Sequence, residues 1–263
     1  MSEKQAKPLI PSATIMLVRD GDAGLEVFMV VRHHQIDFAS GALVFPGGKL
    51  DDGDKAPGIR ARCDGAASDD GALALQVAAI REAFEECGVL LARPKGSSDF
   101  VSAARLAELE PWRDHLHKGR VDMLTFLEEH DLHLACDTLV PFAHWITPAM
   151  MPKRFDTYFY VAIAPSDHVA LHDGHESVDS VWIRPDVALA DAEAKRRTVI
   201  FPTRMNIEKL GRSANVQDAV VAARSNRVVT VLPEMRDVDG VKMLCIPAEA
   251  DYCVTAERLE NIN

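Results

Sequence analysis

Runs of apolar residues, some alternating with polar residues, predict the strands of a sheet along this chain. The first two runs, residues 13–19 and 25–32, are separated by a turn rich in Asp and Gly, which indicates a β-hairpin. Similar runs recur as far as the C-terminal part of the chain. Further strands are predicted at residues 42–45, 139–146, 155–164, 178–183, 228–232 and 241–246.

A second apolar pattern, with steps of three and four residues, predicts helices. The clearest example would place Leu73, Val77, Ile80, Phe84, Cys87 and Leu91 on one side of a helix. Other helices are predicted at residues 103–118, 121–130, 185–195, 203–210 and 216–223. We therefore expect an α/β fold with helices on both faces of a mixed sheet, which is an α/β/α sandwich.

The order of these elements predicts a main domain over residues 10–200, with a helical insertion at about residues 100–132. Residues 201–263 are expected to form an α+β extension packed on the same domain. A chain of 263 residues, of which 48% are hydrophobic, is long enough to bury one sizeable core.

Three glutamates lie on the polar side of the predicted helix around Ile80. With Ile80 at zero and about 100° per residue, Glu85 falls near 140°, Glu82 near 200° and Glu86 near 240°. Like charges at these spacings destabilise a helix, so the cluster favours a bound cation. Carboxylate oxygens suit Mg²⁺ or Mn²⁺. The alternative interpretation is a solvated acidic helix face.

Residues 81–89, with the sequence REAFEECGV, resemble the second half of the Nudix box, G-x5-E-x7-R-E-U-x-E-E-x-G-U, where U is aliphatic. Gly48 and Asp54 fit the first half. Asp54 replaces the first Glu of the pattern, and the stretch from Asp54 to Arg81 is 19 residues longer than in the pattern. The extra residues, about 55–71, are rich in Gly, Ala and Asp, which favours a flexible excursion over a packed element.

An interrupted box of this kind resembles one branch of the Nudix hydrolases, the acyl-coenzyme A diphosphatases. Residues 145–148 and 154–159 are also similar to the middle region of that branch. The resemblance implies a Nudix-type α/β/α sandwich and a divalent metal site. Its metal ligands would be Glu82, Glu85 and Glu86, with Gly48 assigned to the same site.

The resemblance also implies four catalytic residues, Glu85, Arg81, Glu176 and Asp54. Of these, Glu85 is also one of the metal ligands. Arg81 would orient a carboxylate rather than touch substrate, the alternative being an ordinary surface ion pair. Asp54 would support the metal site or the arginine, with Asp51 or Asp52 as substitutes. Glu176, in a polar loop, is the candidate general base, and a simple solvated loop acid is the alternative.

Substrate binding is expected to combine local cations with an apolar groove, because coenzyme A carries phosphates and a long pantetheine arm. Arginine suits phosphate because its fork donates two hydrogen bonds, although either candidate arginine could be structural. The adjacent Met150 and Met151 could line an acyl chain or simply pack in the core. The substrate-binding candidates are Arg32, Phe38, Phe45, Gly47, Gly48 and Arg154.

The charge and cysteine content exclude several other functions. A net charge of −11 and a pI near 5.4 argue against a broad surface for DNA or RNA. The five cysteines are spread out without a C-x-x-C pair, which favours reduced thiols over zinc or a disulfide scaffold. No apolar run is long enough for a membrane span, and we expect a cytoplasmic protein.

These observations predict a Mg²⁺- or Mn²⁺-dependent hydrolase that cleaves the diphosphate of coenzyme A or acyl-coenzyme A. The branch resemblance implies adenosine 3′,5′-bisphosphate and 4′-phosphopantetheine, acylated or not, as products. A second reading keeps the metal chemistry but changes the substrate to ADP-ribose, a dinucleotide or another nucleoside diphosphate derivative. A third is a non-catalytic nucleotide-sensing module. Neither a nucleic acid nor a membrane partner is expected, and a homodimer is left open.

Overall fold

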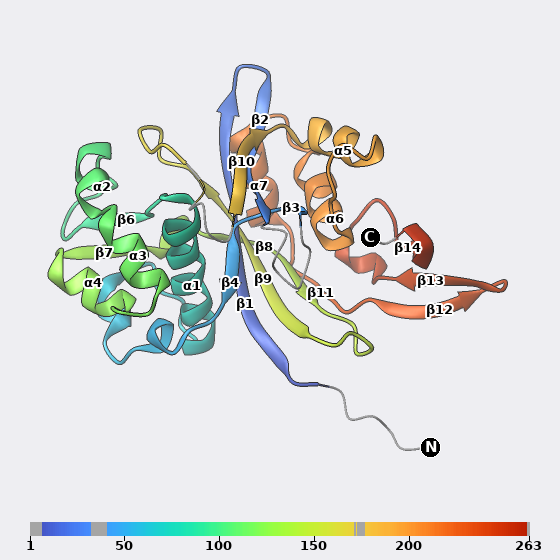
Figure 1. Cartoon of the computed structure of the whole chain (residues 1–263), viewed down its shortest axis with the longest axis horizontal. Helices are drawn as coiled ribbons and strands as arrows, with labels where there is room; N and C mark the ends of the chain where they lie inside the picture. Colours follow the sequence, from blue (N-terminus) through green and yellow to red (C-terminus); the bar gives the residue numbers. More distant parts are fainter. Residues whose placement is uncertain (1–6, 33–40, 171, 173–176, 262–263) are drawn as a thin grey trace.

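A mixed eight-stranded sheet passes through the middle of the molecule (Figure 1). The computed structural model describes residues 7–32, 41–170, 172 and 177–261. The sheet has the order β10-β2-β1-β9-β8-β11, with β3 paired to β2 and β4 paired to β1. Its strands are β1 (Leu9–Gly21), β2 (Gly24–Arg32), β3 (Leu43–Val44), β4 (Gly47–Lys49), β8 (Val140–Ile146), β9 (Arg154–Ile163), β10 (Ser177–Ile183) and β11 (Thr230–Val231).

The long strand β1 organises this sheet. It pairs antiparallel with β2 and β4 and parallel with β9, so the sheet is mixed, as predicted. Its side chains alternate between the two faces of the sheet. Ile15 and Leu17 enter the hydrophobic core on one side, while Met16 and Val18 enter the core on the other. Both faces of the sheet are therefore covered.

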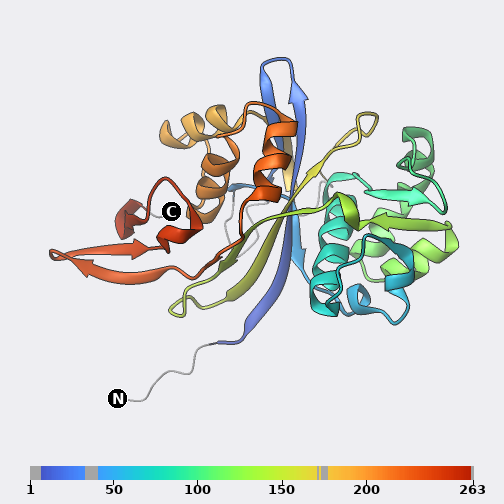
Figure 2. The same cartoon turned by 180° about the vertical axis from the view of Figure 1, so that it is seen from behind.

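One covering layer contains the helices α1 to α4 and a second, three-stranded sheet (Figure 1 and, from behind, Figure 2). The single helix predicted at residues 103–118 is two helices in the structure. Pro111 opens the second helix, because proline has no N–H to continue the preceding hydrogen-bond ladder. The elements are α1 (Asp70–Cys87), α2 (Ala103–Leu109), α3 (Pro111–His117), α4 (Met123–Glu129), β5 (Cys63–Asp64), β6 (Ala92–Pro94) and β7 (Leu132–Ala135).

Helix α1 is buried on its polar side as well as its apolar side. The Asp69 side chain caps its first turn by accepting from the Ala72 N–H, and Gly88 ends it with φ of 68°. The alternative interpretation, a solvated acidic helix face, is wrong, since Glu85 is only 6% exposed. Strand β4 and the short 3₁₀ turn η1 (Asp52–Lys55) pack against the side where the glutamates lie.

The extra residues inside the box are a packed element, so the expectation of a flexible excursion is wrong. The 3₁₀ turn η2 (Ile59–Arg62) places Ile59 in the hydrophobic core and packs against α4 and β7. Strand β5 then pairs parallel with β7, which satisfies its backbone groups. Arg93 ties the region down further, since its guanidinium contacts Asp64 and Asp137. The Gly- and Ala-rich composition of the segment did not indicate that Ile59 would be buried in the core.

The other covering layer is built mainly from the C-terminal part of the chain (Figure 1). It contains α5 (Pro185–Glu193), α6 (Phe201–Leu210), α7 (Val216–Ser225) and a three-stranded sheet of β12 (Glu234–Val238), β13 (Val241–Cys245) and β14 (Ala256–Arg258). A buried polar chain links it to the main sheet: Trp145 Nε1 donates to the Tyr252 hydroxyl over 2.9 Å, which donates to Asn206 Oδ1 over 2.7 Å.

The apolar patterns missed six short strands, β4, β5, β6, β7, β12 and β14, since a segment of two to five residues seldom shows a clear period. All five cysteines are free thiols. Within the residues that the structure describes, no helix has the length and apolar character required to cross a membrane.

Candidate active site

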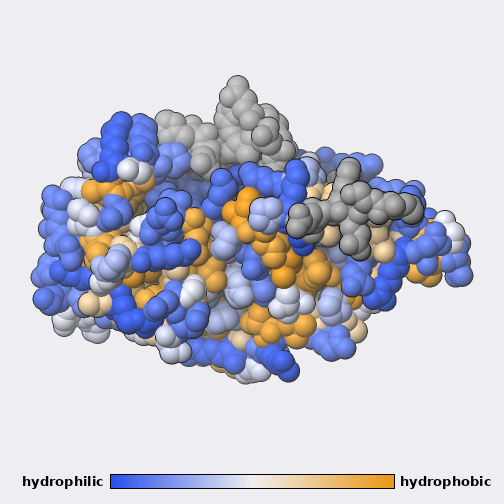
Figure 3. Space-filling view, turned by 90° about the horizontal axis from the view of Figure 1, so that it is seen from below, coloured by the Kyte–Doolittle hydropathy of each residue, from blue (hydrophilic) through white to orange (hydrophobic). Residues whose placement is uncertain are grey.

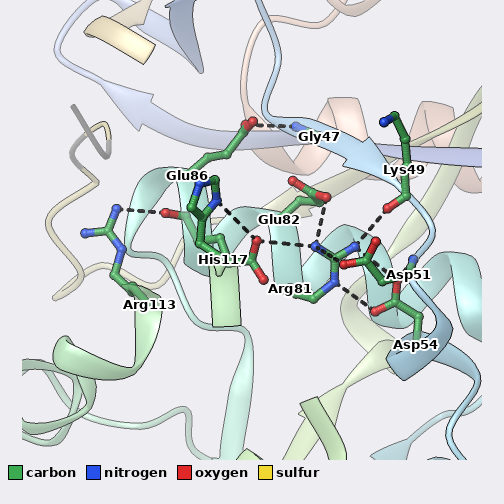
Figure 4. Close-up of polar contacts among 10 residues, drawn as sticks. Gly47, Lys49, Asp51, Asp54, Arg81, Glu82, Glu86, Arg113 and His117 are labelled. Carbon is green, nitrogen blue, oxygen red and sulfur yellow. Dashed lines mark hydrogen bonds and ion pairs between the residues drawn. The ribbon is translucent and has the colours of Figure 1, made fainter. Parts of the chain in front are cut away.

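The Arg81 side chain lies at the centre of the acidic cluster (Figure 4). Its Nε and Nη2 donate to the two oxygens of Asp54 over 2.9 and 3.0 Å, and Nη1 donates to Glu82 over 2.9 Å and to Glu85 over 3.3 Å. Nη2 also donates to the Lys49 carbonyl. Burial alone would lower the pKa of Arg81, but Glu82 and Asp54 outweigh it and raise that pKa. Arg81 is a buried positive charge with all three nitrogens engaged, which excludes the surface ion pair.

Asp54 is held in this cluster despite its distance from Arg81 in the sequence. Turn η1 presents it, and its side chain is 1% exposed. Besides the two hydrogen bonds from Arg81, Asp54 Oδ2 accepts the backbone N–H of Asp51 over 2.8 Å. Asp51 itself is exposed, with Oδ2 3.9 Å from Arg81 Nη1. Asp54 rather than Asp51 is therefore the close partner of the arginine.

Strand β4 brings Gly47 close to Glu86 and Gly48 close to Glu82. The backbone N–H of Gly47 donates to Glu86 Oε2 over 3.0 Å. A Cβ added to Gly48 would lie 2.3 Å from Glu82 Oε1, and one added to Gly47 would lie 2.4 Å from the Ala13 carbonyl. Neither position has room for a larger residue. The paired glycines thus allow β4 to approach α1 closely.

Glu85 has the least satisfied carboxylate of the cluster. Its Oε2 accepts from Arg81, but its Oε1 is buried and has no hydrogen-bond partner among the described residues. Burial raises the pKa of Glu85 to about 7, although Arg81 acts in the opposite direction. A buried carboxylate oxygen without a donor is costly, so this atom favours a partner such as a proton, a water molecule or a cation.

The residues at this position fit a divalent cation by their chemistry. Glu82, Glu85 and Glu86 come from successive turns of α1, and all of their donors are oxygens, which Mg²⁺ and Mn²⁺ prefer. In the parts of the chain that the structure describes, no three acidic, His or Cys side chains already converge as a metal site. Arg81 and Gly47 hold some of the carboxylate oxygens, while Glu85 Oε1 remains unpartnered.

The acidic cluster lies in a groove of about 1130 Å³, which exceeds the roughly 300–1,000 Å³ of common small-molecule pockets. We call the part formed by Asp51, Arg81 and the three glutamates the acid end. Arg32, Lys49 and Lys153 also line the groove, and none of the three forms a salt bridge within the described residues. In a chain with a net charge of −11, these side chains are a local source of positive charge.

The structure brings most of the predicted substrate-binding residues to this groove. Arg32, Phe45, Gly47 and Gly48 line it, and Arg32 Nε is buried without a partner among the described residues. Phe38 and Glu176 lie outside the described residues.

Arg154 is not brought to the groove lining. It is 8% exposed, and its guanidinium donates to the backbone carbonyls of Thr147 and Lys7 over 3.0 and 3.2 Å. This side chain therefore fastens the start of β9 to neighbouring backbone. Its neighbour Phe155 does line the groove, since adjacent residues of a strand point to opposite faces.

Helix α3 also reaches the acid end, which no pattern in the sequence predicted. Arg113 donates to the Glu85 carbonyl over 3.1 Å, and His117 Nδ1 lies 3.9 Å from Glu85 Oε2 (Figure 4). Neither residue belongs to a motif, and only their position in the predicted helical insertion marked them. Lys49 and Lys153 were not predicted as site residues either, because they too belong to no motif.

Comparisons with known proteins show similarity to Nudix proteins. The family model of the NUDT19 Nudix domain matches residues 59–210. The human protein named acyl-coenzyme A diphosphatase NUDT19 is 28% identical over 154 residues, which are 56% of this chain and 41% of the human protein. A Caenorhabditis elegans protein named putative nudix hydrolase 7 is 26% identical over 86% of this chain and 69% of its own length. This chain thus spans less than half of the human relative.

One solved structure is also similar over most of the chain. It is the crystal structure of a NUDIX hydrolase from Alicyclobacillus acidocaldarius, with a TM-score of 0.72 and 26% sequence identity. The similarity covers 85% of this chain and 98% of that protein. The likeness therefore includes both covering layers of the sheet.

Proposed function

This chain belongs to the family of the NUDT19 Nudix domain, and on that premise we propose that it is a metal-dependent hydrolase of coenzyme A or acyl-coenzyme A. The bond cleaved is the diphosphate linkage. The products are adenosine 3′,5′-bisphosphate and 4′-phosphopantetheine, which keeps its acyl group when the substrate carries one. Mg²⁺ or Mn²⁺ is the metal.

The observation that carries this proposal is the buried Glu85 Oε1, which has no hydrogen-bond partner among the described residues and lies with Glu82 and Glu86 in a large groove. Four acids alone would repel a polyanionic substrate. A divalent cation among them would reverse the local charge, and it would also supply the missing partner of Glu85. The predicted Nudix box supports the same assignment, and the family match over residues 59–210 includes these three glutamates.

The chain's own residues would hold the reacting groups in place. Glu82, Glu85 and Glu86, with the backbone of Gly48, would bind the cation, which when bound neutralises diphosphate charge and lowers the pKa of a water molecule. Arg81 keeps Glu82 and Glu85 in their rotamers and does not need to touch substrate. Arg32 and Lys49 line the same groove and are available to phosphate groups.

The volume and the lining of the groove favour coenzyme A over smaller diphosphates. Coenzyme A combines phosphates at one end with a long pantetheine arm, and the groove combines its acid end with apolar residues from β8, β9 and the C-terminal part. The human relative is named for the same substrate class. ADP-ribose and dinucleotides would use the acid end without needing an apolar extension.

The test is a substrate panel in which coenzyme A, an acyl-coenzyme A, ADP-ribose and a dinucleoside polyphosphate are each incubated with Mg²⁺ or Mn²⁺. Products are separated by anion-exchange chromatography. We expect kcat/KM for the coenzyme A compounds to exceed that for ADP-ribose by about tenfold or more. Faster cleavage of ADP-ribose would instead support the nucleoside diphosphate reading. Tight binding without any product would support a sensing module.

A further inference from the structure

We propose that Cys63 and Cys136 form a dithiol site that a peroxide oxidises to a reversible disulfide, which closes the part of the chain that carries the acid end. Cys63 begins β5. Cys136 begins the 3₁₀ turn η3 (Cys136–Thr138), which directly follows β7. The inference goes beyond the proposed function and does not depend on which diphosphate the protein cleaves.

The backbones that carry the two cysteines lie close together. Strand β5 pairs parallel with β7, so that Cys63 is opposite Leu134, and β5 also contacts η3. Two residues after Cys63, a Cβ added to Gly65 would lie 2.5 Å from the Asp137 Cβ and 2.7 Å from its Cα. A disulfide requires two backbones in close approach, and β5 and η3 meet that requirement next to both cysteines.

The two thiols are in contact, and their surroundings differ. Cys63 is partly exposed, whereas Cys136 is 1% exposed and belongs to the hydrophobic core. The hydrogen bond from Cys136 and the charge of Arg60 lower the pKa of Cys63, although burial acts in the opposite direction. The contact with Cys63 and burial raise the pKa of Cys136. Because the thiolate is the reactive form, Cys63 reacts first and Cys136 stays a thiol until the second step.

Contacts that do not involve sulfur hold this arrangement in place. Arg93 Nη1 donates to Asp64 Oδ2 over 3.3 Å and to Asp137 Oδ1 over 2.7 Å, and each of these acids directly follows one of the two cysteines. On the other side, Gln76 Nε2 of α1 donates to the Cys136 carbonyl over 3.4 Å. The thiols are therefore kept together by their neighbours, and a bond between them needs little rearrangement.

The position of the pair gives the bond its structural effect. Between β5 and η3 the chain passes through α1 to α4, so a disulfide would close a loop that contains Arg81 and the three glutamates of the acid end. This loop forms one covering layer of the sheet (Figure 1). In Figure 3 the outer edge of that layer, at the left, is mostly hydrophilic, so the layer borders on solvent that can carry a small oxidant.

The oxidation takes place in two steps, written here for hydrogen peroxide. The Cys63 thiolate attacks one peroxide oxygen, an S–O bond forms, the O–O bond breaks, and the leaving hydroxide takes up a proton to become water. The Cys136 sulfur then attacks the Cys63 sulfur, an S–S bond forms, the S–O bond breaks, and a second water leaves with the Cys136 proton. The two thiols lose two electrons, which reduce the peroxide. A dithiol reductant reverses the reaction by thiol–disulfide exchange.

The experiment treats the reduced full chain, freed of reductant, with hydrogen peroxide. Remaining thiols are blocked by alkylation, and unreduced peptides are identified by mass spectrometry. The parent is compared with Cys63→Ala and Cys136→Ala, in which alanine adds no polar group to the core. The matched control is Cys253→Ala, which removes an exposed cysteine. Circular dichroism checks that each variant is folded.

We expect the parent and Cys253→Ala to give a peptide that links Cys63 to Cys136, with both thiols restored by dithiothreitol. Cys136→Ala should instead keep a sulfenic acid on Cys63 that dimedone labels, because the second thiol is missing. In Cys63→Ala, Cys136 should remain a thiol, since it is buried and protonated.

The oxidised parent should unfold at a Tm about 5 °C or more above that of the reduced parent, because the closed loop restricts the unfolded chain. Cys253→Ala should show the same rise, and the other two variants should show none. Peroxide that oxidises Cys253 but gives no linked peptide in the folded parent would overturn the inference, as would a link that forms only in urea. The linked peptide in the parent decides the question even if an alanine variant fails to fold.

Discussion

Arg81 and Glu85 set the charge balance of the acid end. Helical periodicity was sufficient to predict that Glu82, Glu85 and Glu86 share one side of α1, because angular position depends only on local geometry. It could not predict their burial, which depends on β4 and η1 packing against that side. This burial changes the chemistry of Glu85. A solvated carboxylate would have an ordinary pKa, whereas burial raises the pKa of Glu85 to about 7.

Replacing Glu85 or Glu86 with glutamine should lower kcat by about 100-fold or more, because a neutral amide binds a divalent cation poorly and diphosphate charge is then left uncompensated. Both variants should stay folded, since glutamine preserves the shape of the side chain. Steady-state rates and circular dichroism check the two statements. Near-parent rates in both folded variants would remove these glutamates from the metal site.

The raised pKa of Glu85 also predicts how the metal-free protein responds to pH. The folded state binds the Glu85 proton more tightly than the unfolded state, whose pKa is near 4.5, so this stabilisation is complete below pH 4.5 and is lost as pH rises through about 7. From pH 5 to pH 8, the free energy of unfolding should fall by about 2 to 3 kcal/mol more in the parent than in Glu85→Gln.

Urea denaturation of both proteins in chelator at the two pH values measures this difference. Magnesium or manganese added at pH 8 should restore stability to the parent more than to Glu85→Gln, since ligands that bind only the folded state stabilise it. Identical pH dependence in the two proteins would show that Glu85 titrates normally.

Among the elements, the turn η1 and strand β4 complete a site that the sequence divides. The box residues Gly48 and Asp54 were recognisable from their pattern alone. Their contact with α1 was not, because the intervening residues carry no periodicity. Burial of Ile59 and the pairing of β5 with β7 hold the segment between η1 and α1 in place. Asp54 can therefore lie beside Arg81 although the two residues are far apart in the sequence.

Asp54→Asn should destabilise the protein by about 2 to 3 kcal/mol, because a buried arginine loses its closest anion. The control is Asp52→Asn in the same turn, whose side chain is exposed and is not a hydrogen-bond partner of Arg81. Its effect should be within about 0.5 kcal/mol of the parent. Chemical denaturation compares them, and equal stabilities would show that Glu82 and Glu85 alone hold Arg81.

Gly48→Ala should displace the Glu82 carboxylate, since the new Cβ would stand 2.3 Å from Glu82 Oε1. We expect kcat/KM to fall by about tenfold or more, as misplaced catalytic groups commonly cause, with weaker metal binding by calorimetry. Gly71→Ala, in the first turn of α1, is the matched control and should keep parent activity. Full activity in Gly48→Ala would mean that Glu82 tolerates movement.

For the whole molecule, the α/β sandwich was predicted correctly, and the similar Nudix hydrolase structure confirms that class of fold. The groove was predicted only in part. Its acid end lies on one helix and an adjacent turn, so sequence motifs revealed it. Other lining residues, such as Met150 and Leu244, come from distant parts of the chain, and no local pattern predicts that such residues line one groove. The boundary between the main domain and the C-terminal extension stays a prediction.

The buried chain from Trp145 through Tyr252 to Asn206 holds the C-terminal part against the sheet. Tyr252→Phe should lower the free energy of unfolding by about 1 to 3 kcal/mol, because a buried donor and a buried acceptor lose their partner together. Thermal or chemical denaturation measures this change. A variant as stable as the parent would show that water or neighbouring groups replace the hydroxyl.

Phosphorus NMR of coenzyme A incubated with the protein and Mg²⁺ tests the central claim most directly. We predict that the diphosphate resonances disappear and that two phosphate monoester resonances replace them, without inorganic phosphate. Chelator and the Glu85→Gln variant should each stop the change. Diphosphate resonances that persist with folded, metal-supplied protein would contradict the account.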